Sequence, residues 1–143
     1  MIATIIEAGL IATAGMTTLL WLFDKTGKVN ANMVRAIGSA VTRSVETSLW
    51  PGLSIQFVSG IIFAFFYITA LKMLQLQEIS SLVIAGGVIG FAHGFAFSFV
   101  MVILAEHHPV EKFQNASFQV AIVHFLAHII YGILVGLVFG ISL

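Results

Sequence analysis

The sequence predicts an all-α integral membrane protein, with four transmembrane helices in a compact bundle and one amphipathic interfacial helix between the first and second. Two observations come from composition: 59% of the 143 residues are hydrophobic and only 8% are charged, and the mean hydropathy is +1.09. Soluble domains carry about 25% charged residues, so this chain cannot cover itself with polar surface. The third observation is a set of four apolar runs, each long enough for the ~20 helical residues that cross a bilayer core.

The four runs follow one another in a single transmembrane domain that occupies residues 1–143. Helices are expected in all of them because the hydrocarbon core offers no water to unpaired backbone groups. Pro51 suits the first turn of the second helix, where its missing N–H costs nothing, and Pro109 follows the end of the third. The predicted transmembrane ranges are about 2–23, 51–74, 82–105 and 117–141.

The segment of about 30–49 has a different pattern, which predicts the interfacial helix. Its apolar side chains recur at every fourth residue while polar side chains occupy the other side, as in helices that lie in the membrane interface. Trp50, directly after it, fits the aromatic belt of such interfaces. The alternative is an ordinary solvated helix in a long loop. The apolar positions are Met33, Ile37, Val41, Val45 and Leu49.

The basic residues predict the orientation in the membrane, because cytoplasmic loops carry an excess of lysine and arginine. Five of the six basic residues fall in the loops of about 24–50 and 106–116, which we therefore expect to be cytoplasmic, with both termini outside. A bacterial or archaeal plasma membrane is the expected location. The five residues are Lys25, Lys28, Arg35, Arg43 and Lys112.

Two rows of glycines predict close contact between helices. A stripe without side chains lets two helix backbones approach, and van der Waals contact then replaces the hydrophobic drive that lipid cannot provide. We expect these rows to pack the third and fourth transmembrane helices against each other or against partner subunits. The rows are Gly86, Gly90 and Gly94 on the third helix and Gly132, Gly136 and Gly140 on the fourth.

Three histidines inside the predicted spans are the main candidates for a functional site, since ionisable side chains in hydrocarbon are expensive and usually functional. His124 and His128 lie one turn apart on the fourth helix, and His93 lies on the third. Counting about 1.5 Å per residue, His93 and His128 reach the same depth near the midplane, in a layer with Glu7 and Tyr67.

This pattern predicts a metal ion or a haem group at the three histidines. Three imidazoles suit copper, zinc or non-haem iron, and a b-type haem needs no motif beyond axial histidine. Further metal ligands are expected from the side chains of Glu7, Glu106 and His107. The alternative is structural: a membrane histidine often hydrogen-bonds a neighbouring helix, for about 1 kcal/mol. Likewise, Glu106 and His107 form either a helix end exposed to water or a site through which a metal ion or proton enters the protein.

Motifs of autonomous catalysis are missing from the sequence, which has no nucleophile elbow and no phosphate-binding loop. No catalytic residue is assigned, and the chain is at most a subunit of a membrane metalloenzyme. The six basic and six acidic residues balance, so nucleic acid is not an expected partner. We expect a small membrane subunit or accessory protein that works in the lipid bilayer with other membrane subunits or as a homo-oligomer. The alternatives are a docking subunit without cofactor and a proton- or cation-coupled transporter.

Overall fold

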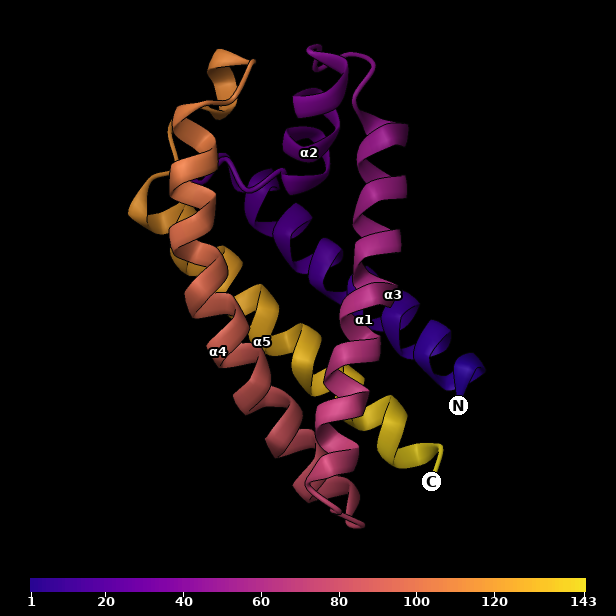
Figure 1. Cartoon of the computed structure of the whole chain (residues 1–143). Coiled ribbons are helices and arrows are strands. Elements are labelled where there is room, and N and C mark those ends of the chain that lie inside the picture. The colour runs from indigo at the N-terminus through magenta and orange to yellow at the C-terminus, as the bar shows by residue number, and fades with distance from the viewer.

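Four long apolar helices account for most of the chain and confirm the predicted helical membrane bundle. The computed structural model describes residues 1–143 and contains no strand. A short helix lies between the first two long ones, and a single 3₁₀ turn precedes the last (Figure 1). In chain order the elements are α1 (Ile2–Lys25), α2 (Met33–Thr42), α3 (Leu49–Met73), α4 (Ile79–Glu106), η1 (Glu111–Phe113) and α5 (Phe118–Ile141).

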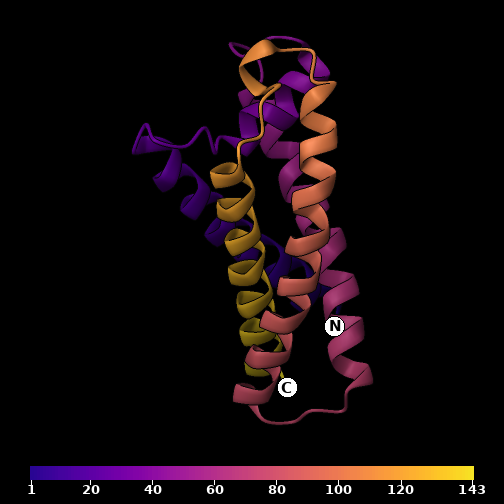
Figure 2. The same cartoon turned by 90° about the vertical axis from the view of Figure 1, so that its left-hand side faces the viewer.

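Helices α4 and α5 lie side by side along their length in both views (Figures 1 and 2). The glycine rows face each other across this antiparallel pair, as the sequence predicts. A Cβ atom built on Gly90 would lie 3.0 Å from the Cα of Ile129, and one built on Gly132 would lie 3.0 Å from the Cα of Gly90. The two backbones are therefore in direct contact, and a side chain at either glycine would separate them.

Helix α1 crosses the bundle obliquely and packs on α3 and α5 (Figure 1). Its inward face consists of small residues, because α3 passes so close that a Cβ on Gly9 would lie 2.6 Å from the Cα of Ile61. The core where α1, α3, α4 and α5 meet is formed by Ala8, Ala12, Ala64, Tyr67, Ile68, Leu71, Leu82, Tyr131, Val135 and Phe139.

Helix α2 is shorter than the predicted range of 30–49. Asn32 caps its start by accepting a hydrogen bond from the backbone N–H of Arg35 (3.2 Å). Its last turn ends at Arg43, whose φ of 55° is left-handed and cannot continue a helix. The chain then turns and enters α3 at Leu49, so the every-fourth-residue pattern belongs to two helices joined by a turn.

Helix α2 runs beside the first turns of α3 (Figure 1). Gly38 and Gly52 meet at the contact, where a Cβ on Gly38 would lie 2.9 Å from the backbone nitrogen of Gly52. The chain termini lie toward the end of the bundle that carries the α3–α4 connection, while the loops around α2 and η1 lie at the opposite end (Figures 1 and 2). We call this opposite end the loop end.

Candidate functional site

All three histidines of the predicted site line one cavity of about 180 Å³ inside the bundle, which we call the interior cavity. They reach it from α4 (His93) and α5 (His124 and His128). Helices α1, α2 and α3 complete the wall. The remaining lining residues are Met16, Leu20, Met33, Ile37, Gln56, Ser59, Gly60, Phe63, Phe97 and Tyr131.

His93 and His128 are in ring contact at one side of the cavity. Their ring centroids are 4.6 Å apart with an interplanar angle of 72°. The Nδ1 atom of His93 is hydrogen-bonded to the Tyr67 hydroxyl at 3.0 Å. Phe63 packs on His93 and Phe97 on His128, with centroid distances of 4.5 and 4.7 Å. The aromatic rings pack against the two imidazoles, of which His128 is buried and His93 is half-buried.

The histidines of α5 share a second feature, in which each Nδ1 atom contacts the backbone carbonyl four residues earlier. The Nδ1–H of His124 donates to Val120 O (2.8 Å), and that of His128 donates to His124 O (2.7 Å). A carbonyl oxygen only accepts hydrogen bonds, so the proton of each neutral ring resides on Nδ1 and Nε2 keeps its lone pair. Metal-binding histidines are commonly oriented in this way.

The Nε2 atom of His124 is buried and has no hydrogen-bond partner, in a side chain that is only 2% exposed. The Oε1 atom of Gln56, a second residue of the cavity wall, is also buried without a partner. The Nε2 atom of the same side chain donates a hydrogen bond to the Thr17 hydroxyl (2.7 Å). Buried polar atoms are seldom left without partners, since each costs about 1–3 kcal/mol. Both residues line the interior cavity, so its wall contains two buried polar atoms without a hydrogen-bond partner.

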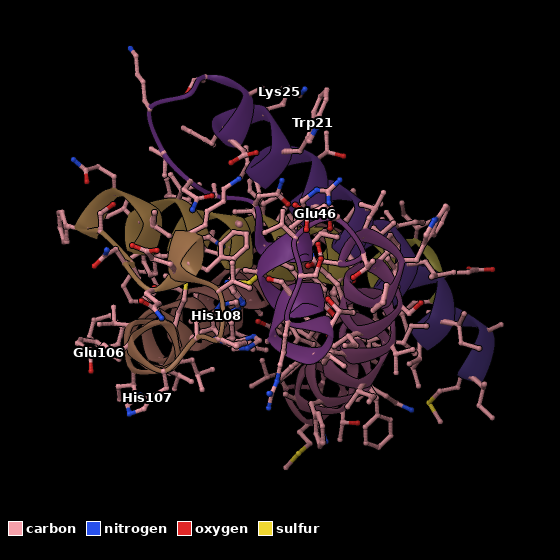
Figure 3. All side chains as sticks on the ribbon, turned by 90° about the horizontal axis from the view of Figure 1, so that it is seen from above. Trp21, Lys25, Glu46, Glu106, His107 and His108 are labelled. Atoms are coloured by element: carbon pink, nitrogen blue, oxygen red, sulfur yellow. The ribbon has the colours of Figure 1, made fainter.

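The three acidic or basic side chains that were expected to add ligands do not join this cavity. Glu7 is exposed on the outer face of α1, because the neighbouring Ala8 occupies the inward face. Glu106 and His107 are exposed at the last turn of α4 and lie at the outer edge of the molecule when seen from the loop end (Figure 3). Glu7, Glu106 and His107 therefore do not line the interior cavity with the three histidines.

No group of three or more histidine, aspartate or glutamate side chains is close enough together to hold a metal ion in this structure. The histidines line a common cavity but are not gathered around one point. Any ligand shared by all three would have to be small enough to enter the cavity and to be reached from two helices.

Two residues that line the interior cavity were missing from the candidate ligands. Met16 and Met33 bring thioether sulfurs to the interior cavity from α1 and α2. His108, which follows His107 in the sequence, lies outside the interior cavity and reaches α2 through a 2.9 Å hydrogen bond from its Nε2 to Ala36 O. An apolar methionine gives no signal in the sequence that separates packing from ligation, and the position of α2 is not visible in helical spacing.

Comparisons of this chain with protein-family models, with curated proteins and with solved structures find no match.

Proposed function

We propose that this protein is a small integral membrane subunit or accessory protein, and that its interior cavity binds a transition-metal ion. The observation that carries the proposal is the His124 Nε2 atom, which is buried and unpartnered in a side chain that lines a cavity with two more imidazoles. A metal ion would supply Lewis acidity or one-electron chemistry. The residues of this chain would hold it, exclude water and keep the imidazoles in one tautomer.

Among the metals, copper(I) is the ion that the lining residues favour. Thioether and imidazole together are a soft ligand set, and Met16 and Met33 line the cavity with the histidines. No carboxylate lines it. A monovalent ion also needs less compensation for lost hydration than a divalent one in a wall without negative charge.

The cavity volume supports an ion over a haem group. Sites for drug-sized ligands measure about 300–1,000 Å³, whereas the interior cavity has about 180 Å³. At about 30 Å³ for each water molecule, that is room for a few waters or one partly hydrated ion.

The proposal is tested by titrating the purified protein with copper(I), zinc or iron(II) under anaerobic conditions, in competition with a chromophoric chelator. We expect one copper(I) per chain, and at least a tenfold weaker affinity for each of the variants His93→Ala, His124→Ala and His128→Ala. Glu7→Gln is the control, because Glu7 is exposed on the outer face of α1 and lines no part of the interior cavity. Absence of bound metal, or unchanged affinity in all three cavity variants, would contradict the metal site.

The role as a subunit is supported by Glu7, which lies on the outer face of a membrane-spanning helix. A carboxylate placed in the bilayer costs about 2.5–3.5 kcal/mol on insertion scales, and a polar surface on a neighbouring protein would relieve that cost. Crosslinking at Glu7 through a Glu7→Cys variant in native membranes, followed by identification of the product, tests this part. The alternative, a docking subunit without cofactor, predicts the same crosslink but no metal.

For the orientation, we propose that the loop end is cytoplasmic and that both termini are outside. Five of the six basic residues lie at or near the loop end, in residues 24–50 and 106–116. Trp21 lies next to Lys25, whose Nζ is 5.4 Å from the ring centroid (Figure 3). A tryptophan paired with a lysine is typical of a membrane interface. Labelling of single cysteines at Lys28 and Ser142 in sealed vesicles tests it, since the sequence contains no other cysteine.

A further inference from the structure

A second cavity adjoins the interior cavity on its loop-end side. It measures about 520 Å³, is partly open to the outside, and is lined mainly by α2, the end of α4, the start of α5 and the segment between them. We call it the antechamber. The two cavities have four lining residues in common, and these form the boundary between them: Met33, Ile37, Phe97 and His124.

The antechamber has an unpartnered acceptor at each end. At the loop end, Asn30 donates from Nδ2 to Lys112 O (2.9 Å), while its Oδ1 is buried without a partner. At the inner end is the unpartnered Nε2 of His124. The wall between them is mostly apolar and includes Met101, Ala105 and Val120. At both ends of the antechamber, these acceptors can take a hydrogen bond from a water molecule of a small hydrated cation.

The wall formed by α2 is held to the rest of the protein by two polar contacts with the α4–α5 segment. One is the bond from Asn30 to Lys112 O, and the other runs from His108 Nε2 to Ala36 O at 2.9 Å. The tautomer of His108 is fixed, because Val110 N–H donates to its Nδ1 at 3.0 Å and so leaves the proton on Nε2. Helix α2 itself has ten residues, and its other face packs on α3, where Gly38 and Gly52 bring the two backbones into contact.

From this geometry we infer that the antechamber is the route by which a small hydrophilic cation reaches His124, and through it the interior cavity, from the loop end. The identity of the cation rests on the proposed function, whereas the route does not. His124 stands at the boundary of the two cavities with its Nε2 free, which makes it the first intramembrane ligand that an entering ion would meet.

The route is testable with a thiol reagent because the natural chain has no cysteine. Ser59→Cys is the reporter, since Ser59 lines the interior cavity but not the antechamber and the exchange keeps the side-chain size. The probe is 2-aminoethyl methanethiosulfonate, a small cation, and the rate of modification is followed by mass spectrometry. If Ser59→Cys does not fold, Met16→Cys reports from the same cavity.

The blocking substitution is Ala40→Trp, which adds an indole ring to a residue of the antechamber wall. Its control is Val41→Trp, because Val41 is the next residue of α2, is 66% exposed and lines neither cavity. We expect Ala40→Trp to slow modification of the reporter at least tenfold, and Val41→Trp to change the rate by less than twofold. A reporter that does not react in the unblocked chain, or equal rates in both tryptophan variants, would overturn the route.

Copper(I) binding in the same variants separates the two proposals. A reporter that reacts through the antechamber in a protein that binds no metal leaves the route intact and removes the metal site. Metal bound with full affinity and an uptake rate that Ala40→Trp does not alter would instead retain the site and remove the route.

Discussion

The hydroxyl oxygen of Tyr67 on α3 lies 3.0 Å from the Nδ1 atom of His93 on α4. This hydrogen bond joins two spans inside the bundle and sets the rotation of the His93 ring, which in turn contacts His128 at a centroid distance of 4.6 Å. Tyr67 is 3% exposed, so no water competes for its hydroxyl. The ring positions at the interior cavity therefore depend on a tyrosine of another helix.

Removal of this hydroxyl should affect His93 and little else. We expect Tyr67→Phe to lower the free energy of unfolding by about 1 kcal/mol, the usual value for a hydrogen bond between membrane helices. In a double-mutant cycle with His93→Phe, the two losses should not add. Tyr131→Phe is the matched control, because the Tyr131 hydroxyl donates to Gly60 O instead. Additive losses for Tyr67 and His93 would contradict the pairing.

Two neighbouring glycines of α4 should respond very differently to an added methyl group. At Gly90 the new Cβ would lie 3.0 Å from the backbone of Ile129, whereas at Gly87 it would meet the Ile133 side chain at 3.2 Å. A side chain can rotate away but a helix backbone cannot. We expect Gly90→Ala to cost about 1–3 kcal/mol and Gly87→Ala to cost less than about 1 kcal/mol.

Thermal unfolding in detergent, followed by the fluorescence of Trp21 and Trp50, measures both variants. The prediction fails if Gly87→Ala is as destabilising as Gly90→Ala, since the α4–α5 contact would then not be the cause.

The hydrogen bond from His108 to Ala36 O should protect α2 from local opening. We expect His108→Ala to speed amide hydrogen exchange in α2 about fivefold, because a net loss of about 1 kcal/mol corresponds to that change in an opening equilibrium. His107→Ala should leave the exchange of α2 unchanged, since the His107 ring bonds only within its own helix, to Ile103 O. Equal effects of the two variants would contradict the assignment.

The turn between α2 and α3 should be sensitive to acid. A hydrogen bond from the Ser44 hydroxyl (2.7 Å), with a smaller contribution from the charge of Arg35, lowers the pKa of Glu46 below its ordinary value. A lowered pKa means that Glu46 stabilises the turn at pH values above the ordinary glutamate range, and that this contribution is lost as the pH falls through the lowered pKa.

Carboxyl carbon chemical shifts, followed by NMR through a pH titration, measure this pKa directly. We expect Ser44→Ala to raise the pKa of Glu46 toward its ordinary value. Ser142→Ala is the control, because the Ser142 hydroxyl bonds to Val138 O at the end of α5 and its removal should leave the Glu46 titration unchanged. An unchanged Glu46 titration in Ser44→Ala would contradict the role of the hydroxyl.

Sequence reasoning predicts the helical bundle correctly because membrane-spanning helices are specified locally. Long apolar runs, Pro51 at the start of α3 and the facing glycines all act within one helix or one pair. The same local reasoning predicts too long a helix for α2. Apolar residues continue to recur at every fourth position beyond Arg43, although Arg43 adopts a left-handed conformation that ends the helix. A backbone reversal does not interrupt a pattern of side-chain types.

For the site, the sequence predicts how deep a side chain lies along its helix better than it predicts which way that side chain faces. His93 and His128 were expected at one level, and they are in contact. Glu7 was placed at the same level but faces outward, because the packing of Ala8 and Ala12 decides which face of α1 turns inward. Which face of a helix turns inward depends on contacts with residues that are distant in the sequence. An apolar span with small residues on several faces therefore does not show from its own sequence which face is buried.

The glycine contact between α4 and α5 has a consequence for how this protein can vary over time. Because the two backbones touch at the glycines that flank His93 and His128, backbone contact holds α4 and α5 at a fixed separation there. Residues on the outer faces, such as Phe95 and Phe99, are more than half exposed and can be exchanged as the surrounding lipids change. Substitutions on the lipid-facing surface can therefore accumulate without changing the backbone contact that positions His93 and His128.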